Sequence, residues 1–543
     1  MPGERRLVVA SAIAVVATAA FLPGSGLGSS TAVVPGAQAT PAGLAAAIRA
    51  RLGTGAIRSS LAARSTEGPR FGDLVAVSAD GTTALVGAPF VRNGKGAAYV
   101  FHVSDAGSWS SSKTPTAALT NKAGPAKDQY FGLGIALSAD GTTAFVGAPL
   151  ADAGVSGAIS VFHVPAEDAW ASSSTPTATL KVSDGIAIGS SLAVSLDGTT
   201  LVAGAPYYNN FAGGAYVFHV SSEGAWPSTS TPTATLDNAG ESQNDIAAGD
   251  AVAISGDGTT ALLSDSLNPS GGGAYVYHVS AEDAWTTSST PTAILSDANS
   301  ASNDFLGSGL ALSGDGTVAL LGAPGVNAGR GAVDVFRTSG AAAWTSTSIP
   351  TATLTKAGGS QEDGLGWRAG MSADGTTALV TAPGLDAQRG GAYIFRVADE
   401  GAWASSSAPA ATLTDSGGRA RDSLGWGPAL SADGATAFDG APGVRFETGA
   451  VDVFHVADAS SWASSSTPTA ILTVSALNQC VVPRLRGLTV LAAKSALRAR
   501  SCRLGRVRRV VRPHAKRGRV VSQSSGPGSR WAVGARVAVK VAK

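Results

Sequence analysis

The chain has 543 residues, with 39 Lys and Arg, 38 Asp and Glu, and two cysteines, so its formal net charge is only +1. This near-neutrality conceals two oppositely charged regions: residues 70–475 carry 16 basic and 36 acidic side chains, whereas residues 476–543 carry 17 basic side chains and no acidic ones. The sequence contains no H-E-x-x-H, G-x-S-x-G or G-x-x-x-x-G-K pattern and no zinc-spaced set of Cys and His, which excludes the common metalloprotease, serine-hydrolase, P-loop and zinc-site signatures.

The N-terminal region is typical of an export signal. Arg5 and Arg6 precede an apolar stretch over residues 7–22, and a possible cleavage site follows at Ala39. These 16 residues are fewer than the roughly 20 that a transmembrane helix needs. Because Ala39 lies far from the apolar stretch, earlier cleavage and an uncleaved anchor are alternatives. We predict a signal peptide over residues 1–39, a linker over residues 40–70, and a secreted, extracellular protein that associates with the cell wall.

Residues 71–475 consist of one unit repeated seven times. Each unit is a variant of FG-x-x-x-AxS-ADGTTALVGAP, followed by GAxYVFHV, a Trp and TPTATLT. Successive units are 60, 57, 60, 58, 59 and 59 residues apart, measured between their central aspartates: Asp80, Asp140, Asp197, Asp257, Asp315, Asp374 and Asp433. A fixed period of this length indicates one supersecondary unit stacked on itself.

Each unit contains four apolar runs of strand length. In the first unit these runs span residues 74–77, 83–88, 97–103 and 116–120. Asp80-Gly81 lies between the first two runs and is typical of a tight hairpin turn. The second and third runs are apolar on both faces, which suits strands enclosed between neighbours. We therefore predict an all-β fold, a seven-bladed β-propeller with four-stranded antiparallel blades. A β-solenoid is the alternative, but its rungs are shorter and parallel.

The unit resembles the FG-GAP repeat of integrin α-subunit propellers and their bacterial relatives. The resemblance covers residues 71 to about 474 and rests on two motifs, shown in the first unit by Phe71-Gly72 and by residues 87–89 (GAP). In that family the first hairpin often carries a calcium loop with several acidic residues. Here the hairpin is S-A-D-G-T-T, and its single carboxylate cannot supply the six to eight oxygen ligands that calcium prefers. We therefore expect no metal and no cofactor.

The same hairpin is superficially similar to the Asp-box of sialidase propellers. In this chain, however, Asp and Gly are adjacent, as in Asp257-Gly258, and no aromatic residue follows the threonines. The three central arginines that this likeness implies cannot be located at equivalent points of three units. We therefore predict no catalytic residues and a protein that is not an enzyme.

Two recurrent side chains are predicted to be structural. Five of the six histidines occupy one position of the third strand, where units five and six have Arg337 and Arg396: His102, His163, His219, His278 and His455. Third strands lie away from a propeller axis, so we expect each ring to pack locally and to bond to a neighbouring carbonyl. A Trp recurs in every unit and is predicted to anchor the loop between strands three and four: Trp109, Trp170, Trp226, Trp285, Trp344, Trp403 and Trp462.

Positions that differ between units are better indicators of a ligand, because a ligand touches one sector of a ring whereas the scaffold is required in every sector. Two kinds of position vary on one rim, the loops joining strands two and three and the residue after the FG motif. They supply the candidate ligand-binding residues Tyr207, Tyr208, Asn209, Asn210, Phe211, Arg92, Arg445, Trp367 and Trp426. We predict a platform that stacks sugars or grips a peptide. The alternative is that these rings fold back over their own blade ends.

Residues 476–543 are predicted to form a small, basic α+β domain. A V-P-x-x-x-G segment precedes a helical stretch over residues 489–500, and strands are expected over residues 505–511, 519–522 and 535–541. This order, together with Gly518-Arg519-Val520 and Gln523, is similar to a PASTA domain. The resemblance implies association with peptidoglycan. Both cysteines, Cys480 and Cys502, lie inside the module, and an even pair in an exported protein indicates a disulfide.

Taken together, these features predict an exported, non-enzymatic binding or adhesion protein. Its propeller rim would recognise a glycan or a protein, and its basic tail would associate with peptidoglycan or another anionic envelope polymer. Because export is predicted, nucleic acid is the weaker choice of partner, and no membrane span is expected once the signal is cleaved. Two alternatives are a glycan-active hydrolase or lyase that uses carboxylates in the propeller channel, and a wall-associated spacer.

Overall fold

A computed structural model describes most of the chain beyond the predicted linker. The described residues are 69–122, 129–152, 156–183, 187–208, 212–239, 248–444, 448–475, 479–498, 500, 502–512, 515–532 and 535–543. The predicted signal peptide, residues 1–39, and the linker up to residue 68 therefore lie outside the described residues.

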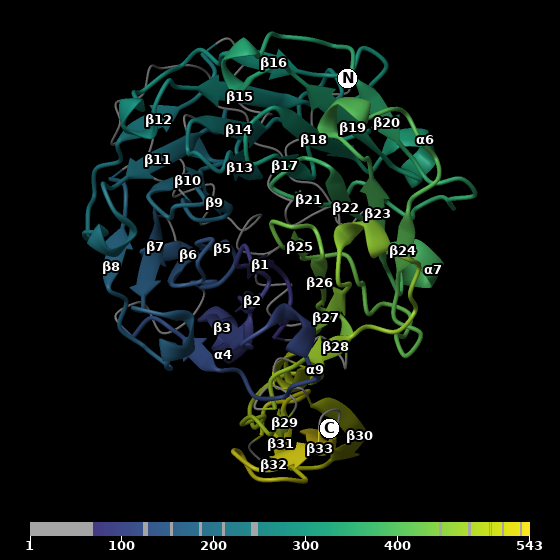
Figure 1. The fold of residues 1–543 in the computed structure, drawn as a ribbon. Helices are drawn as coiled ribbons and strands as arrows, with labels where there is room; N and C mark the ends of the chain where they lie inside the picture. The colour runs from purple at the N-terminus through teal and green to yellow at the C-terminus, as the bar shows by residue number, and fades with distance from the viewer. Residues whose placement is uncertain are drawn as a thin grey trace, which may run out of the picture.

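The repeated region forms a seven-bladed β-propeller, as predicted (Figure 1). Each unit builds one four-stranded antiparallel sheet, with its strands hydrogen-bonded in chain order, and the seven sheets surround one axis. Blades one to four are β1 (Val75–Val77), β2 (Thr83–Ala88), β3 (Ala97–His102), β4 (Ala117–Leu119); β5 (Ile135–Leu137), β6 (Thr143–Asp152), β7 (Ser156–His163), β8 (Ala178–Leu180); β9 (Leu192–Val194), β10 (Thr200–Gly204), β11 (Ala215–His219), β12 (Ala234–Leu236); β13 (Val252–Ile254), β14 (Thr260–Ser264), β15 (Ala274–His278), β16 (Ala293–Leu295). Blades five to seven are β17 (Leu310–Leu312), β18 (Val318–Ala323), β19 (Ala332–Arg337), β20 (Ala352–Leu354); β21 (Ala369–Met371), β22 (Thr377–Thr381), β23 (Ala392–Arg396), β24 (Ala411–Leu413); β25 (Ala429–Leu430), β26 (Thr436–Ala441), β27 (Ala450–His455), β28 (Ala470–Leu472).

Short helical turns occupy the loops of the blades. One-turn helices follow the second strand in blades one, five and six: α4 (Val91–Gly94), α6 (Val326–Gly329) and α7 (Leu385–Gln388). A 3-10 turn precedes the recurrent Trp in every blade: η1 (Ala106–Ser108), η2 (Glu167–Ala169), η3 (Glu223–Ala225), η4 (Glu282–Ala284), η5 (Ala341–Ala343), η6 (Glu400–Ala402) and η7 (Ala459–Ser461).

The second and third strands of each blade form the core. In blade one every residue of β2 is buried, and β3 is buried except at its last residue, His102. Their side chains alternate between the two neighbouring blades: Val86 packs toward blade seven, whereas Leu85 packs toward blade two. Strands that are apolar on both faces are stable here because a blade lies on either side.

The ring closes without exchange of a strand, since the last unit supplies all four strands of its own sheet. The innermost strands contact one another in order around the axis, and β25 contacts β1. At the outer edge, seven parallel bridges join the fourth strand of each blade to a loop of the next, including Leu472 of blade seven to Ser112 of blade one. Near the hairpins, backbone bonds also link equivalent residues of neighbouring blades; the amide of Ala432 donates to the carbonyl of Ala79 at 2.9 Å.

The FG and GAP sequences meet across the boundary between blades. Phe131 of blade two bridges to Gly96 of blade one, and the carbonyl of Gly132 lies so close to Gly87 that a Cβ there would stand 2.3 Å from it. The equivalent contact closes the ring, where a Cβ on Gly440 would stand 1.9 Å from the carbonyl oxygen of Gly72. Gly72 itself has a φ of +85°, and a Cβ on it would stand 2.4 Å from the carbonyl oxygen of Ala450. These glycines permit a close approach of two backbones that no other residue allows.

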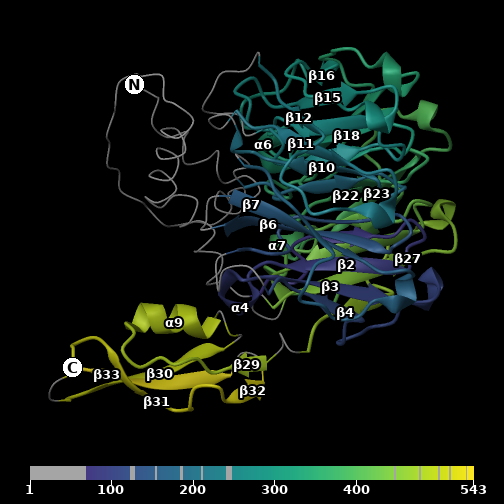
Figure 2. The same cartoon turned by 90° about the vertical axis from the view of Figure 1, so that its left-hand side faces the viewer.

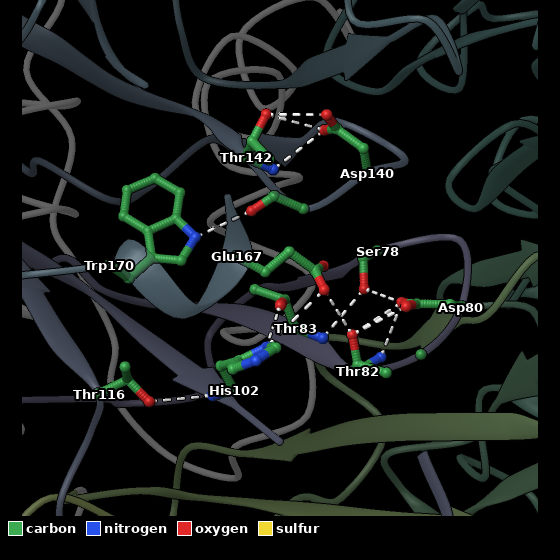
Figure 3. Close-up of polar contacts among 12 residues, drawn as sticks. Ser78, Asp80, Thr82, Thr83, His102, Thr116, Asp140, Thr142, Glu167 and Trp170 are labelled. Atoms are coloured by element: carbon green, nitrogen blue, oxygen red, sulfur yellow. Dashed lines mark hydrogen bonds and ion pairs between the residues drawn. The ribbon is translucent and has the colours of Figure 1, made fainter. Parts of the chain in front are cut away.

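A polar network fixes each Asp-Gly hairpin (Figure 3). In blade one, Asp80 accepts hydrogen bonds from the hydroxyl of Ser78 at 2.6 Å and from the amide of Thr82 at 3.0 Å. Burial acts to raise the pKa of Asp80, but the hydrogen bonds outweigh it, so the pKa lies below its usual value. The stability that this carboxylate contributes is therefore present at neutral pH and is lost as the pH falls through the lowered pKa.

The recurrent Trp and His side chains are structural. In all seven blades the Trp Nε1 donates to the carbonyl of the hairpin Gly, as from Trp109 to Gly81 at 2.8 Å, which confirms the predicted anchoring role. The His Nδ1 lies 2.9 Å from a Thr hydroxyl on the paired strand, as at His102 and Thr83. The predicted carbonyl partner is therefore wrong, because the register of β2 and β3 places Thr83 opposite His102.

At four of the seven boundaries between blades, the hydroxyl of a threonine donates a hydrogen bond to a glutamate of the next blade. We call this contact the staple. In the first, the hydroxyl of Thr82 in blade one donates to Glu167 of blade two at 2.9 Å, with His102 3.8 Å from the same carboxylate (Figure 3). The other three Thr–Glu pairs are Thr142–Glu223, Thr199–Glu282 and Thr317–Glu400. Units one, five and seven carry Ala at this position: Ala106, Ala341 and Ala459.

Replacing Glu167 by Ala is expected to lower the free energy of unfolding by about 1 kcal/mol, because one partly buried hydrogen bond to a charged acceptor is lost. Urea denaturation of the full chain measures this change. The control is Asp168→Ala at the neighbouring, exposed residue, which should alter stability by less than about 0.5 kcal/mol. Equal effects of the two substitutions would contradict the staple.

Residues after 475 form a small α+β module, as predicted. Helix α9 (Val490–Arg498) lies on one side of the sheet formed by β30 (Arg503–Val510), β33 (Arg536–Ala542) and β31 (Val520–Gln523), as Figure 2 shows. A two-stranded sheet of β29 (Gln479–Val481) and β32 (Arg530–Ala532) was not predicted. The amide side chain of Gln523 accepts from Leu485 and donates to Pro483, which ties the first loop of the module to its sheet.

The core of this module is apolar and includes one cysteine. Cys502 is 2% exposed and packs with Leu497 and Val537. The side chain of the other cysteine, Cys480, lies outside the described residues. The Cys480–Cys502 pairing therefore stays a prediction.

Candidate ligand site at the propeller axis

Five of the nine predicted ligand-binding residues cannot be placed. Asn209, Asn210, Phe211 and Arg445 lie outside the described residues, and the backbone of Arg92 lies in α4 while its side chain is outside the described part. The other four, Tyr207, Tyr208, Trp367 and Trp426, are described, and they divide into two groups.

Tyr208 packs on its own blade. Its ring lies 5.7 Å from the ring of Tyr216 in an edge-to-face arrangement, and its amide donates to the carbonyl of Ala205 at 2.9 Å. This is the alternative that the sequence left open, in which a loop ring folds back over the end of its blade. Tyr207, one residue earlier, is partly exposed in surface area. Burial of its hydroxyl, and then the carboxylate of Asp250 in blade four, raise the pKa of Tyr207.

Trp367 and Trp426 meet across blades six and seven. Their ring centroids are 5.4 Å apart at an interplanar angle of 57°, and the side chains are 6% and 7% exposed. The prediction of an open stacking platform is therefore wrong for these rings, because each covers the other. The Trp367 Nε1–H is nevertheless buried without a hydrogen-bond partner among the described residues. A buried donor left unpaired costs about 1–3 kcal/mol, so its retention calls for an explanation.

A buried ion pair supports the Trp pair. Arg70, the last residue of the predicted linker, packs into the propeller with its guanidinium 4.6 Å from the centre of the Trp426 ring. The same guanidinium donates to Asp73 of blade one at 2.6 and 2.9 Å. Arg70 and Asp73 are 4% and 5% exposed, so the cation, the carboxylate and the indole form one desolvated unit at the boundary of blades seven and one.

Arg368 extends this unit toward the opposite blades. Its guanidinium donates to the carbonyl of Ser308 in blade five at 2.8 Å. Burial lowers the pKa of Arg368, and the carboxylates of Asp250 in blade four and Asp73 in blade one oppose that shift. Arg368 and Asp250 are partly exposed, whereas Arg70 and Asp73 are buried.

These contacts, together with the electrostatic effects among Tyr207, Asp250, Arg368 and Asp73, define one group of side chains, which we call the axial cluster: Arg70, Asp73, Tyr207, Asp250, Trp367, Arg368 and Trp426. Apart from Tyr207, its members lie beside the FG position of their units, at the start of the innermost strand. Six blades reach this end of the axis: the seven residues come from blades one, three, four, six and seven, and blade five supplies the Ser308 carbonyl. Segments that are far apart in the sequence are thereby brought together around the axis of the ring (Figure 1).

The sequence pattern predicted Tyr207, Trp367 and Trp426 as ligand-binding residues. It did not indicate the other members of the axial cluster: Arg70, Asp73, Asp250 and Arg368. A signal for two of them was available, because the residue after the FG glycine varies from unit to unit: Asp73, Leu133, Ser190, Asp250, Ser308, Trp367 and Trp426. Only its aromatic members were selected as candidates. Arg70 could not be found in this way, since it precedes the repeat.

The axial cluster has the chemistry of a site for a neutral polar ligand. Two guanidiniums and two carboxylates balance one another, a phenol and an indole N–H add further groups, and the partly exposed members offer both donors and acceptors. Within the described part of the chain, no group of three or more His, Cys, Asp and Glu is placed to hold a metal ion. No helix among the described residues is long and apolar enough to cross a membrane.

Comparison with known proteins yields one finding about the fold. No family model matches the chain, and no curated protein is similar to it. Among solved structures, the chain is similar to hydrazine synthase from Kuenenia stuttgartiensis, with a TM-score of 0.45 and 13% identity over 72% of this chain and 97% of that one. The match agrees with a β-rich, propeller-like architecture, and neither the FG-GAP nor the PASTA resemblance is supported by a family match.

This comparison also corrects one sequence-based prediction. We predicted that the protein is not an enzyme, yet the solved structure that it resembles in fold is, by name, an enzyme. The prediction is therefore withdrawn. At this level of similarity the match transfers no activity to the present chain.

Proposed function

We propose that the protein is a binding protein whose propeller holds a hydroxyl-rich, glycan-type ligand at the axial cluster. The observation that carries this proposal is the convergence of the partly exposed Arg368, Asp250 and Tyr207 at one end of the axis, together with an unpaired but buried Trp367 Nε1–H. A ligand reaches that N–H only by displacing the side chains that cover it, so the proposal includes this rearrangement. Sugar hydroxyls both donate and accept, which suits a site with balanced charges and mixed donors and acceptors. The resemblance of the repeat to FG-GAP propellers also supports a binding role.

We further propose that the C-terminal module, PASTA-like in its motif order, attaches the protein to an anionic polymer of the cell envelope after export. Its 17 basic and no acidic residues support this role, and the exposed Arg506, Arg508 and Arg509 on β30 concentrate charge on one strand. We include the Cys480–Cys502 disulfide in this proposal, because a crosslink would stabilise so small a module.

A second candidate is a hydrolase or lyase acting on glycan. Two carboxylates, Asp73 and Asp250, both act electrostatically on Arg368, and a pair of carboxylates is what glycoside hydrolysis commonly uses. Asp73 is 5% exposed and bound to Arg70, so only Asp250 is accessible to a substrate. Binding is the better supported function for that reason.

The decisive variant is Trp367→Phe, which removes the indole N–H and keeps an aromatic ring. We expect about tenfold weaker glycan binding, the equivalent of one lost hydrogen bond. The free energy of unfolding should change by less than about 1 kcal/mol, because removal of an unpaired buried donor offsets the packing lost with the smaller ring. Glycan-array screening of the full chain, followed by calorimetry on the best ligand, measures the affinity. Urea denaturation measures the free energy of unfolding.

Arg368→Ala should weaken binding of the same ligand at least as much, whereas Arg330→Ala, at an exposed position on the same rim, should leave the affinity unchanged.

Sedimentation with isolated cell wall tests the C-terminal module, where Arg506→Ser with Arg508→Ser should reduce retention in a salt-dependent manner. Failure of every glycan to bind, or equal affinity for Trp367→Phe, would contradict the proposed site. Turnover of a bound glycan that is lost in Asp250→Asn would favour the enzyme.

A further inference from the structure

Blade seven contains two acidic residues inside its sheet. Asp439 on β26 and Asp452 on β27 are direct cross-strand partners, and they are 1% and 3% exposed. The equivalent residues of blade one are Val86 and Tyr99, which are cross-strand partners in the same way. Two carboxyl groups have thus replaced an apolar pair in the core of one blade.

Both acids lie on the side of blade seven that faces blade six. Along β26, Phe438 packs toward blade one while Ala437 packs with Leu379 and Ile394 of blade six. Successive side chains of a strand point to opposite faces, so Asp439 lies on the same face as Ala437. Along β27, Phe454 packs toward blade six, and Asp452 shares its face. We call this boundary the blade 6–7 seam.

The seam offers the acids little that would favour their charged form. Neither carboxylate oxygen of Asp439 has a partner with full hydrogen-bond geometry among the described residues, and the backbone amides of Gly425 and Gly440 only partly oppose the rise in its pKa. Burial and then Asp452 raise the pKa of Asp439 well above its usual range. Burial and then two further acids, Asp415 and Asp422, do the same for Asp452. Of the basic groups nearby, Arg419 and Arg389 act on Asp422.

The backbone next to Asp439 also positions the axial cluster. The amides of Gly425 and Trp426 both approach the carbonyl of Gly440, at 3.1 and 3.2 Å, and Gly440 follows Asp439 directly. Trp426 in turn packs on Trp367, so the Trp pair spans the same two blades as the buried acids do. A shift of β26 against blade six would therefore move Trp426 relative to Trp367.

We propose that Asp439 and Asp452 are a proton-controlled latch of the blade 6–7 seam, closed when the acids are protonated and loosened when they ionise. The direction of its pH dependence follows from the linkage between proton binding and folding. An acid with a raised folded pKa contributes stability that is complete below the unfolded value of about 4 and is lost as the pH rises through the folded pKa. Hairpin aspartates with a lowered pKa, such as Asp80, have the opposite effect on stability, so the latch is visible only in a local measurement. Its effect on ligand binding rests on the proposed function, but the latch itself does not.

Hydrogen exchange of the full chain, followed by mass spectrometry and corrected for the intrinsic rate at each pH, tests the latch. The peptides of interest cover residues 424–444. Between pH 5 and pH 8 we expect the opening equilibrium of this segment to rise roughly tenfold or more, since one unit of pKa shift corresponds to a factor of ten. The double variant Asp439→Asn and Asp452→Asn should lose this pH dependence. A second variant, Asp439→Val and Asp452→Tyr, restores the residues of blade one and should lose it too.

The matched control is Asp334→Asn, since Asp334 occupies the position of Asp452 in blade five and accepts from Thr353 at 2.8 Å. It should leave the pH dependence of residues 424–444 intact. Exchange in this segment that is independent of pH in the unaltered protein, or that rises equally in both double variants, would overturn the latch. If the latch is found but glycan affinity does not change with pH, or no glycan binds, the axial cluster and not the latch is at fault.

Discussion

Gly72→Ala is expected to destabilise the protein by roughly 3 kcal/mol or more, measured as the free energy of unfolding in urea. Two effects add. Gly72 has a φ of +85°, which disfavours any residue with a Cβ by about 1 kcal/mol, and the new Cβ would stand 2.4 Å from the carbonyl oxygen of Ala450. Relief of that contact requires blades one and seven to separate at the point where the ring closes.

Gly358→Ala separates the two effects. Gly358 has a similar φ of +71°, but a Cβ there would meet nothing within 4 Å. This substitution should therefore show only the backbone effect of about 1 kcal/mol. If both variants lost the same stability, the close approach of Gly72 to Ala450 would have no energetic weight.

Asp73→Asn is expected to lower the free energy of unfolding by about 3 kcal/mol, because it leaves the buried Arg70 guanidinium without its carboxylate. Arg70 and Asp73 have side-chain exposures of 5% each and lie 2.6 Å apart. The double variant Arg70→Met with Asp73→Leu should recover most of that loss, since an apolar pair of similar volume removes both desolvated charges. The same urea titration measures both variants.

The chain offers a matched control for this prediction. Asp386 and Arg389 form an ion pair with the same spacing of three residues, but their side chains are 66% and 48% exposed. Asp386→Asn should change stability by less than about 1 kcal/mol, as exposed ion pairs contribute little. A loss of the same size at Asp73 and Asp386 would mean that burial of the Arg70 pair is unimportant.

The scaffold was predictable because the repeat samples each structural position seven times. The Asp-Gly dipeptide in the first unit indicated a hairpin, and the structure has β1 and β2 on either side of Asp80-Gly81. The expected strand over residues 83–88 is β2 without change. Local turn chemistry and alternation of apolar residues decide such features, and both are visible in a single unit.

The axial cluster was only partly predictable, since it depends on which units become neighbours when the ring closes. Arg70 and Trp426 lie at opposite ends of the repeated region, and their contact follows from the packing of blade seven on blade one. The burial of the Trp367 side chain could not be predicted either, because the ring that covers it belongs to the next unit. A sequence pattern reports the periodicity of one unit, whereas exposure depends on its neighbours.

The buried acids illustrate an intermediate case. Asp439 and Asp452 interrupt apolar runs that are unbroken in the first unit, so the anomaly can be read from the sequence. That they oppose each other requires the register of β26 and β27, and their position against blade six requires the arrangement of the blades. The direction in which pH changes stability through these acids follows only from the arrangement of the blades.

Since every unit completes its own sheet, no terminal segment is needed to finish a neighbouring blade. Moving the start of the gene to any boundary between units should therefore yield a circularly permuted protein with an intact ring, provided that the old ends are joined. The seven blades are in this respect equivalent units, so the loops of one blade can change while the other blades keep the ring closed.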